Sequence, residues 1–245
     1  MSRYKLVIEY DGRDFVGWQR QDNGLGVQQV LEEAVKKFCG EKVRLFVAGR
    51  TDAGVHALGQ TAHADLTKDT DANTVRDALN FHVKPHAISV LSVAEVDDEF
   101  HARTSAKERA YFYRIINRRP PLALEEGKAW WVPQPLDAAA MNEAAAKLVG
   151  HHDFSTFRAA GCQADGPVKT LGALTVGRLG EEIHIKARAI SFLYHQVRNI
   201  VGTLKLVGEG KWTPDDVARA LAAADRAAGG PTAPPDGLYL SEVVY

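Results

Sequence analysis

The stretch VRLFVAGRTDAGVHALGQTAHADL, residues 43–66, places a glycine-rich loop between two apolar segments. The apolar patterning predicts one strand over residues 43–47 and another over residues 60–66. The loop between them, AGRTDAGVHALGQ (residues 48–60), holds three glycines and a single carboxylate, Asp52. We therefore expect a strand–loop–strand unit that carries Asp52 in its loop.

The same patterning, followed outward, predicts strands and helices in a repeating order. The first half is expected to hold strands over 4–10, 43–47, 60–66 and 87–96, and helices over 27–38 and 71–81. The second half is expected to hold strands over 107–117, 170–178, 181–190 and 238–244, and helices over 137–149, around 193–204 and from Thr213 onward. Each half approximates the split βαβ order of ferredoxin-like domains.

This order predicts an α+β fold of two ferredoxin-like, RRM-like subdomains related by a pseudo-two-fold axis. Their boundary is expected near residues 104–106, which gives an N-terminal subdomain over 1–105 and a C-terminal subdomain over 106–245. Two antiparallel sheets that meet side by side leave a central cleft, and clefts are where active sites form. The loop with Asp52 is expected to reach that cleft.

Composition limits the class of protein. The 245 residues are 45% hydrophobic and 25% charged, as in ordinary globular proteins, and the formal net charge is -1. We expect no membrane span and no secretion signal. Cys39 and Cys162 are too few for a disulfide framework or a zinc site, so a reduced, cytoplasmic location is expected and Cys162 is read as a plain thiol. Any RNA-binding face must come from local clustering of basic residues.

Three interpretations of Asp52 compete on residue chemistry alone. The carboxylate can cap a turn by accepting backbone N–H groups. It can form a metal site with His56 and His63, although the separation of those histidines matches no compact ligand motif. It can also act as a catalytic nucleophile or general base, and the glycines around it would let a substrate backbone come close.

Five sequence blocks resemble, in order, the TruA-type tRNA pseudouridine synthases. The central block is AGRTDAGVHALGQ, in which that family has its catalytic aspartate. The other blocks are EYDGRDFVGWQRQ (9–21), FHARTSAKERAYFYRI (100–115), DFSTFR (153–158) and HQVRNIVG (195–202). The resemblance implies that Asp52 is catalytic, and it favours that interpretation over a turn cap. Attack at C1′ of the ribose and attack at C6 of the base remain open.

The resemblance also assigns three binding residues and a substrate. Tyr111 matches a tyrosine that contacts the target base, Arg198 an arginine paired with the catalytic carboxylate, and Arg50 an arginine that fills the gap left by the flipped base. A half-buried strand aromatic and a solvated arginine are the alternatives for Tyr111 and Arg198. Helical spacing places His195 near Arg198. The implied reaction turns uridine into pseudouridine at positions 38, 39 and 40 of the tRNA anticodon stem-loop.

The resemblance implies a homodimer, and the isomerisation implies neither a cofactor nor a metal. Basic residues are expected to form a surface for the RNA stem: Arg103, Lys107, Arg109, Arg114, Arg118, Arg119, Arg158, Lys169 and Arg188. The rival hypotheses are a non-catalytic RNA-binding protein and a metal-dependent hydrolase built on Asp52 and the two histidines.

Overall fold

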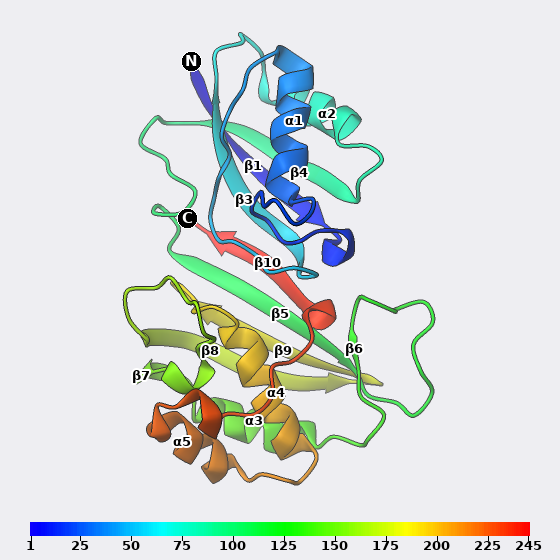
Figure 1. Ribbon diagram of the computed structural model, residues 1–245, viewed down its shortest axis with the longest axis vertical. Coiled ribbons are helices and arrows are strands. Elements are labelled where there is room, and N and C mark those ends of the chain that lie inside the picture. The colour runs from blue at the N-terminus through cyan, green and yellow to red at the C-terminus, as the bar shows by residue number, and fades with distance from the viewer. The chain divides into compact units, whose positions relative to one another are not determined.

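The chain divides into two compact units in a computed structural model that describes all residues, 1–245 (Figure 1). The first unit comprises Met1–Lys107 together with Tyr239–Tyr245, and the second comprises Glu108–Leu238. The expected boundary at 104–106 lies close to the first crossing between units. The expected division, however, placed the C-terminal strand in the second subdomain, whereas this strand belongs to the first unit because it pairs with a strand there.

The first unit is a mostly antiparallel sheet with two helices. Its elements are β1 (Ser2–Tyr10), α1 (Val27–Cys39), β2 (Phe46–Val47), β3 (His56–Leu66), α2 (Ala72–His82), β4 (Ile88–Val96) and β10 (Leu238–Val244). Strand β1 lies between β3 and β4 and is antiparallel to both. Strand β2 pairs antiparallel with β3, and β10 pairs parallel with β3. Helix α2 packs on β4 and beside α1 (Figure 1).

The core of the first unit follows from periodicity. Strand β1 buries every second side chain, namely Tyr4, Leu6, Ile8 and Tyr10, because successive strand residues point to opposite faces. Helix α1 buries an apolar stripe at helical spacing, formed by Val27, Val30, Leu31, Ala34 and Val35.

The second unit is also a mostly antiparallel sheet with helices. Its elements are β5 (Glu108–Ile116), β6 (Trp130–Trp131), α3 (Ala138–Ala146), β7 (Gly150–Asp153), β8 (Val168–Leu179), β9 (Glu182–Ala189), α4 (Gln196–Gly208) and α5 (Pro214–Ala223). Strand β9 lies between β5 and β8 and is antiparallel to both. Strand β7 extends the sheet beyond β8, and β6 pairs parallel with β5. Helix α3 packs on β8 and against α4 and α5.

The α+β class is confirmed, and most of the predicted elements are present. Helix α1 ends at Gly40, which takes a φ of 79°, and α2 begins after Asp71, whose carboxylate accepts backbone N–H groups. The strand expected over 43–47 is reduced to β2, and β3 begins at His56, four residues earlier than expected. None of the helices is long and apolar enough to cross a membrane.

Candidate active site

The loop that carries Asp52 ends in a turn closed by main-chain groups. The Val55 N–H donates to the Asp52 carbonyl at 3.1 Å, and Gly54 takes a φ of 77°, which a turn tolerates best at a glycine. The Gly54 N–H, which an Asx-turn at Asp52 would use, donates instead to the Phe15 carbonyl at 3.3 Å. The turn therefore has a backbone explanation of its own, and the Asp52 side chain is half-buried.

Buried groups hold the loop on the N-terminal side of Asp52. The Thr51 hydroxyl lies 2.7 Å from the Tyr10 hydroxyl, and the Thr51 carbonyl accepts the Trp18 N–H at 3.1 Å. The Gln60 side-chain amide donates to the Gly49 carbonyl at 2.7 Å. Burial raises the pKa of Tyr10 to about 12, so its phenol stays neutral in this network.

Two glycines of the segment 9–21 let the chain lie directly against this loop. A Cβ on Gly17, whose φ is 107°, would lie 2.6 Å from the Thr51 carbonyl oxygen. A Cβ on Gly12 would lie 2.1 Å from the Val55 carbonyl oxygen. Because both contacts are with backbone atoms, any larger residue would displace the loop. This packing gives a physical reason for the glycines of the first sequence block.

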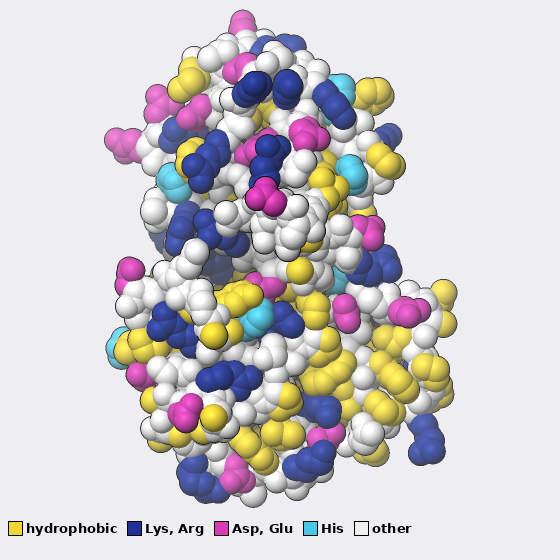
Figure 2. Space-filling model, in the orientation of Figure 1, with side chains coloured by type: hydrophobic (Ala, Val, Ile, Leu, Met, Phe, Trp, Pro, Cys, Tyr) yellow, Lys and Arg dark blue, Asp and Glu magenta, His cyan; other side chains and the backbone are white.

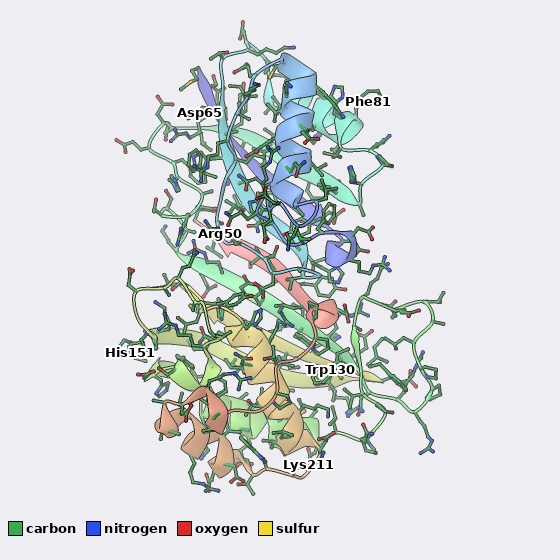
Figure 3. All side chains as sticks on the ribbon, viewed as in Figure 1. Arg50, Asp65, Phe81, Trp130, His151 and Lys211 are labelled. Carbon is green, nitrogen blue, oxygen red and sulfur yellow. The ribbon has the colours of Figure 1, made fainter.

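The loop points its side chains alternately inward and outward. Thr51 is only 7% exposed, whereas Asp52 is half-buried. Arg50, on the other side of Thr51, is exposed (Figure 3). Arg50 and Asp52 therefore lie outside the core of the first unit, on a segment whose backbone the core fixes. An accessible cation and an accessible carboxylate on a fixed loop are suited to contact a bound substrate.

The two histidines of the hypothetical metal site are structural hydrogen-bond acceptors. The Nδ1 atom of His56 accepts the Gly12 N–H at 3.0 Å, and the Nδ1 atom of His63 accepts the Ala102 N–H at 3.1 Å. Burial lowers the pKa of His63 to about 4, which keeps that ring neutral. No group of three or more His, Cys, Asp or Glu side chains is arranged to hold a metal ion. The structure thus gives both histidines a role in anchoring the fold.

Tyr111 lies on β5 in the second unit, opposite Ala187 of β9. Its ring meets the ring of Phe192 edge to face, with centroids 5.0 Å apart and planes at 85°. Two residues further on, Tyr113 is fully buried and donates from its hydroxyl to the Pro234 carbonyl at 2.8 Å. Tyr111 is half-buried, so of these two tyrosines it is the one with an accessible ring.

Arg198 lies in the first turns of α4, also in the second unit. Its Nε donates to the Ala233 carbonyl at 2.8 Å, and its backbone carbonyl accepts the Ala233 N–H at 3.1 Å. Its Nη1 lies 3.2 Å from the Nε2 of His195, which confirms that these two side chains are neighbours. The guanidinium is half-buried and held by the segment around Ala233, unlike a mobile surface arginine.

Comparison with known proteins gives one consistent result. The family model described as tRNA pseudouridine synthase matches residues 6–105 and 144–245. The protein named tRNA pseudouridine synthase A of Paramagnetospirillum magneticum is 64% identical over 245 residues, covering 100% of this chain and 96% of that protein. The protein of the same name from Rhodospirillum centenum is 63% identical over 245 residues, and the alignment covers 100% of each chain. The chain belongs to the tRNA pseudouridine synthase family.

The tRNA pseudouridine synthase model covers three of the four expected site residues. Arg50, Asp52 and Arg198 lie within its two matched ranges, whereas Tyr111 lies in the unmatched interval from 106 to 143. The alignments with the named relatives span the whole chain and so include Tyr111. The structure places Arg50 and Asp52 on one loop of the first unit, and Tyr111 and Arg198 on β5 and α4 of the second.

Two of the basic residues that were expected to bind RNA phosphates form interactions with other residues of the protein instead. Arg114 forms ion pairs with Glu125 at 2.9 Å and Glu182 at 2.8 Å, and its hydrogen bond lowers the pKa of Glu182 to about 2. Arg109 is buried and donates to the Ile190 carbonyl at 2.6 Å. Figure 2 shows Lys and Arg side chains interspersed with Asp and Glu on both units. The expected stem-binding surface therefore cannot consist of all nine residues acting as phosphate ligands.

Sequence reasoning missed the residues that support the loop. Sequence patterning placed Tyr10 and Gln60 in strands and indicated no role for Thr51. The sequence did hold one signal. Tyr10 stands at the end of the expected strand 4–10, and Gln60 stands at the start of the expected strand 60–66, directly after the loop that carries Asp52.

Proposed function

We propose that the protein isomerises uridine to pseudouridine in tRNA, at positions 38, 39 and 40 of the anticodon stem-loop. The family assignment and the full-length relatives at 63% and 64% identity support an isomerase of this class. The observation that carries the proposal is the accessible carboxylate of Asp52 on a loop whose neighbouring residues are bonded to the core. We assign Asp52 the role of catalytic nucleophile.

The reaction is an internal rearrangement. The bond between C1′ and N1 of uridine breaks, the uracil turns, and a bond forms between C1′ and C5. The C5 hydrogen leaves as a proton and N1 takes up a proton, so the product is an isomer of the substrate. A nucleophilic carboxylate can hold the sugar or the base while the glycosidic bond is broken. Atoms and electrons balance without an oxidant or reductant, so we propose no cofactor and no metal.

The target base must leave its stack before the carboxylate can reach it, which costs a few kcal/mol. We propose that Tyr111 stacks on the extruded uracil, a contact worth about 1–3 kcal/mol, with Phe192 supporting the tyrosine from its edge. Arg50 would occupy the place that the base leaves. Arg198 would pair with the Asp52 carboxylate and keep it ionised, a role suited to a guanidinium that His195 and Ala233 already orient.

We further propose that the two units are ferredoxin-like repeats and that the enzyme works as a homodimer in the cytoplasm. The position of β1 between β3 and β4, with α1 and α2 as crossovers, supports a ferredoxin-like order in the first unit. The TruA-type resemblance supports the dimer, and the two free cysteines, Cys39 and Cys162, support the location. Light scattering on the purified protein measures the oligomeric state directly.

The deciding experiment measures tritium released from tRNA labelled at C5 of its uridines. Wild type, Asp52→Asn and Asp69→Asn are compared in the presence of EDTA, with tRNA binding measured in parallel. Asp69 is an exposed carboxylate between β3 and α2, so its variant controls for loss of one negative charge. We expect release by wild type and Asp69→Asn, and none by Asp52→Asn, which still binds tRNA.

The other outcomes separate the rival functions. Release by Asp52→Asn at the wild-type rate removes that carboxylate from the chemistry and leaves the isomerase. Loss of wild-type release in EDTA indicates a metal-dependent enzyme. Binding of tRNA without release by any variant indicates a non-catalytic RNA-binding protein and overturns the proposal.

A further inference from the structure

We propose that Tyr10 and Gln60 are positioning residues for Asp52: their buried side chains hold the Thr51 hydroxyl and the Gly49 carbonyl, on the two sides of Arg50, and so fix the position of the carboxylate. This inference rests on the proposed role of Asp52 in catalysis. Neither residue is assigned to substrate contact.

The two residues reach the loop from neighbouring strands. Tyr10 ends β1 and Gln60 lies on β3, and these strands pair in antiparallel register. The Gln60 Nε2 donates to the Gly49 carbonyl at 2.7 Å, and Tyr10 Oη lies 2.7 Å from Thr51 Oγ1. Residues 49 and 51 flank Arg50, so the loop is held at two points with one residue between them.

The network is buried and internally consistent. Gln60 is 0% exposed and Tyr10 4%. The Gln60 Nε2 also lies 3.5 Å from Tyr10 Oη, a long contact in which the amide can only donate. The Tyr10 and Thr51 hydroxyls share the shorter hydrogen bond, in which either oxygen can donate. The buried Tyr10 hydroxyl and the buried Gln60 amide thus each have a hydrogen-bond partner in the loop.

The need for such a device follows from the structure of the loop. Residues 48–55 form no strand or helix, so no regular ladder fixes the position of Asp52. Misplacement of a catalytic group by about 1 Å can lower a rate by about a hundred-fold. Side chains rooted in a sheet are rigid supports, because the pairing of the strands determines where they point. Tyr10 and Gln60 transmit the position of the β1–β3 pair to the loop.

The test compares two tyrosines on the same strand. Tyr10→Phe removes the hydroxyl that holds Thr51, and Tyr4→Phe removes a buried hydroxyl that donates to the Thr70 carbonyl at 2.6 Å, away from the loop. Single-turnover tritium release, the Kd for tRNA and the Tm are measured for both. We expect Tyr10→Phe to slow release roughly ten- to a hundred-fold with the Kd within two-fold of wild type. Tyr4→Phe should keep the wild-type rate with a similar loss of Tm.

Variants at Thr51 test the same contact from the other side. Thr51→Ser retains the hydroxyl and should release tritium at close to the wild-type rate, whereas Thr51→Val should match Tyr10→Phe. The double variant Tyr10→Phe/Thr51→Val should be no slower than either single variant, because both remove one interaction.

The outcomes distinguish this inference from the proposed function. If wild type releases tritium and Tyr10→Phe releases it equally fast, the positioning role is wrong while the synthase activity stands. The role is also wrong if Tyr4→Phe is slowed as much as Tyr10→Phe, or if the loss lies in the Kd rather than in the rate. If wild type releases none, the proposed function and this inference fall together.

Discussion

Gly202→Ala should damage the second unit through a single methyl group. Gly202 lies within α4, where a Cβ would come 1.7 Å from the Pro231 carbonyl oxygen and 3.2 Å from the Ala233 nitrogen. The segment that would have to move is the one that binds Arg198 through Ala233. The substitution therefore tests both the packing of α4 and the dependence of Arg198 on its support.

The magnitude follows from two opposing terms. Replacing a helical glycine by alanine favours the helix by about 1 kcal/mol. The carbonyl oxygen must retreat by about 1.7 Å to reach an ordinary contact of 3.4 Å. Because backbone must shift, we take the upper end of the usual cost of overpacking, about 3 kcal/mol. We expect a net loss of about 2 kcal/mol in the free energy of unfolding, together with slower tritium release.

The matched control is Gly208→Ala in the same helix. There the new Cβ would meet side-chain atoms alone, Met141 Sδ at 2.7 Å, Met141 Cγ at 3.1 Å and Leu136 Cδ2 at 3.2 Å, and a methionine side chain adapts more readily than a backbone carbonyl. Denaturant unfolding and tritium release are measured for both variants. Gly208→Ala should stay near the wild type in both. Wild-type stability and activity in Gly202→Ala would refute the reasoning, because the Pro231 segment would then yield at no cost.

Two further predictions concern stability. The pKa of His63 is about 4 in the folded protein and 6.5 ordinarily, so between these pH values the unfolded chain binds more protons than the folded one. The stability of the folded protein is therefore highest, with respect to His63, above pH 6.5, and it falls as the pH is lowered to 4. At about 1.4 kcal/mol for each pH unit the loss is at most about 3.5 kcal/mol. His63→Gln should flatten the fall in unfolding free energy measured from pH 7 to pH 4.5. Thr213→Ala should cost about 1 kcal/mol in denaturant unfolding, without slowing tritium release, because Thr213 and Asp216 cap α5 reciprocally.

A specific result would contradict each of these two stability predictions. An unchanged pH slope in His63→Gln would show that the acid sensitivity arises elsewhere. Thr213→Ser retains a capping hydroxyl and should stay close to wild type, so equal losses in the serine and alanine variants would argue against the cap.

Elements set by local chemistry could be predicted from the sequence. Asp71, Asp137 and Thr213 each accept backbone N–H groups at the start of a helix, a cue contained within four residues. The strand expected over 43–47 illustrates the limit. Its patterning is that of a strand, but only Phe46 and Val47 find partners on β3, and pairing depends on a segment that patterning does not specify.

The candidate site residues stand out in the sequence, whereas the residues that support their loop do not. Asp52 stands out because a lone carboxylate among glycines is visible in the sequence. The contact between Tyr10 and Thr51 joins residues 41 positions apart, and no local pattern reports it. The ion pairs of the basic residues are equally non-local, because Arg114 of β5 pairs with Glu182 of β9, which is 68 positions away in the sequence.

The parallel pairing of β10 with β3 has a consequence for the order of events during synthesis. His56 stacks on Tyr239 with ring centroids 4.6 Å apart, and the Tyr245 hydroxyl donates to the Ala102 carbonyl at 2.7 Å. These partners of the first unit are translated after the whole of the second. While the second unit is still being synthesised, the positions of β3 that β10 covers, His56 and Ala57, therefore remain without that partner strand until residues 238–244 have been made, and these positions adjoin the loop that carries Asp52.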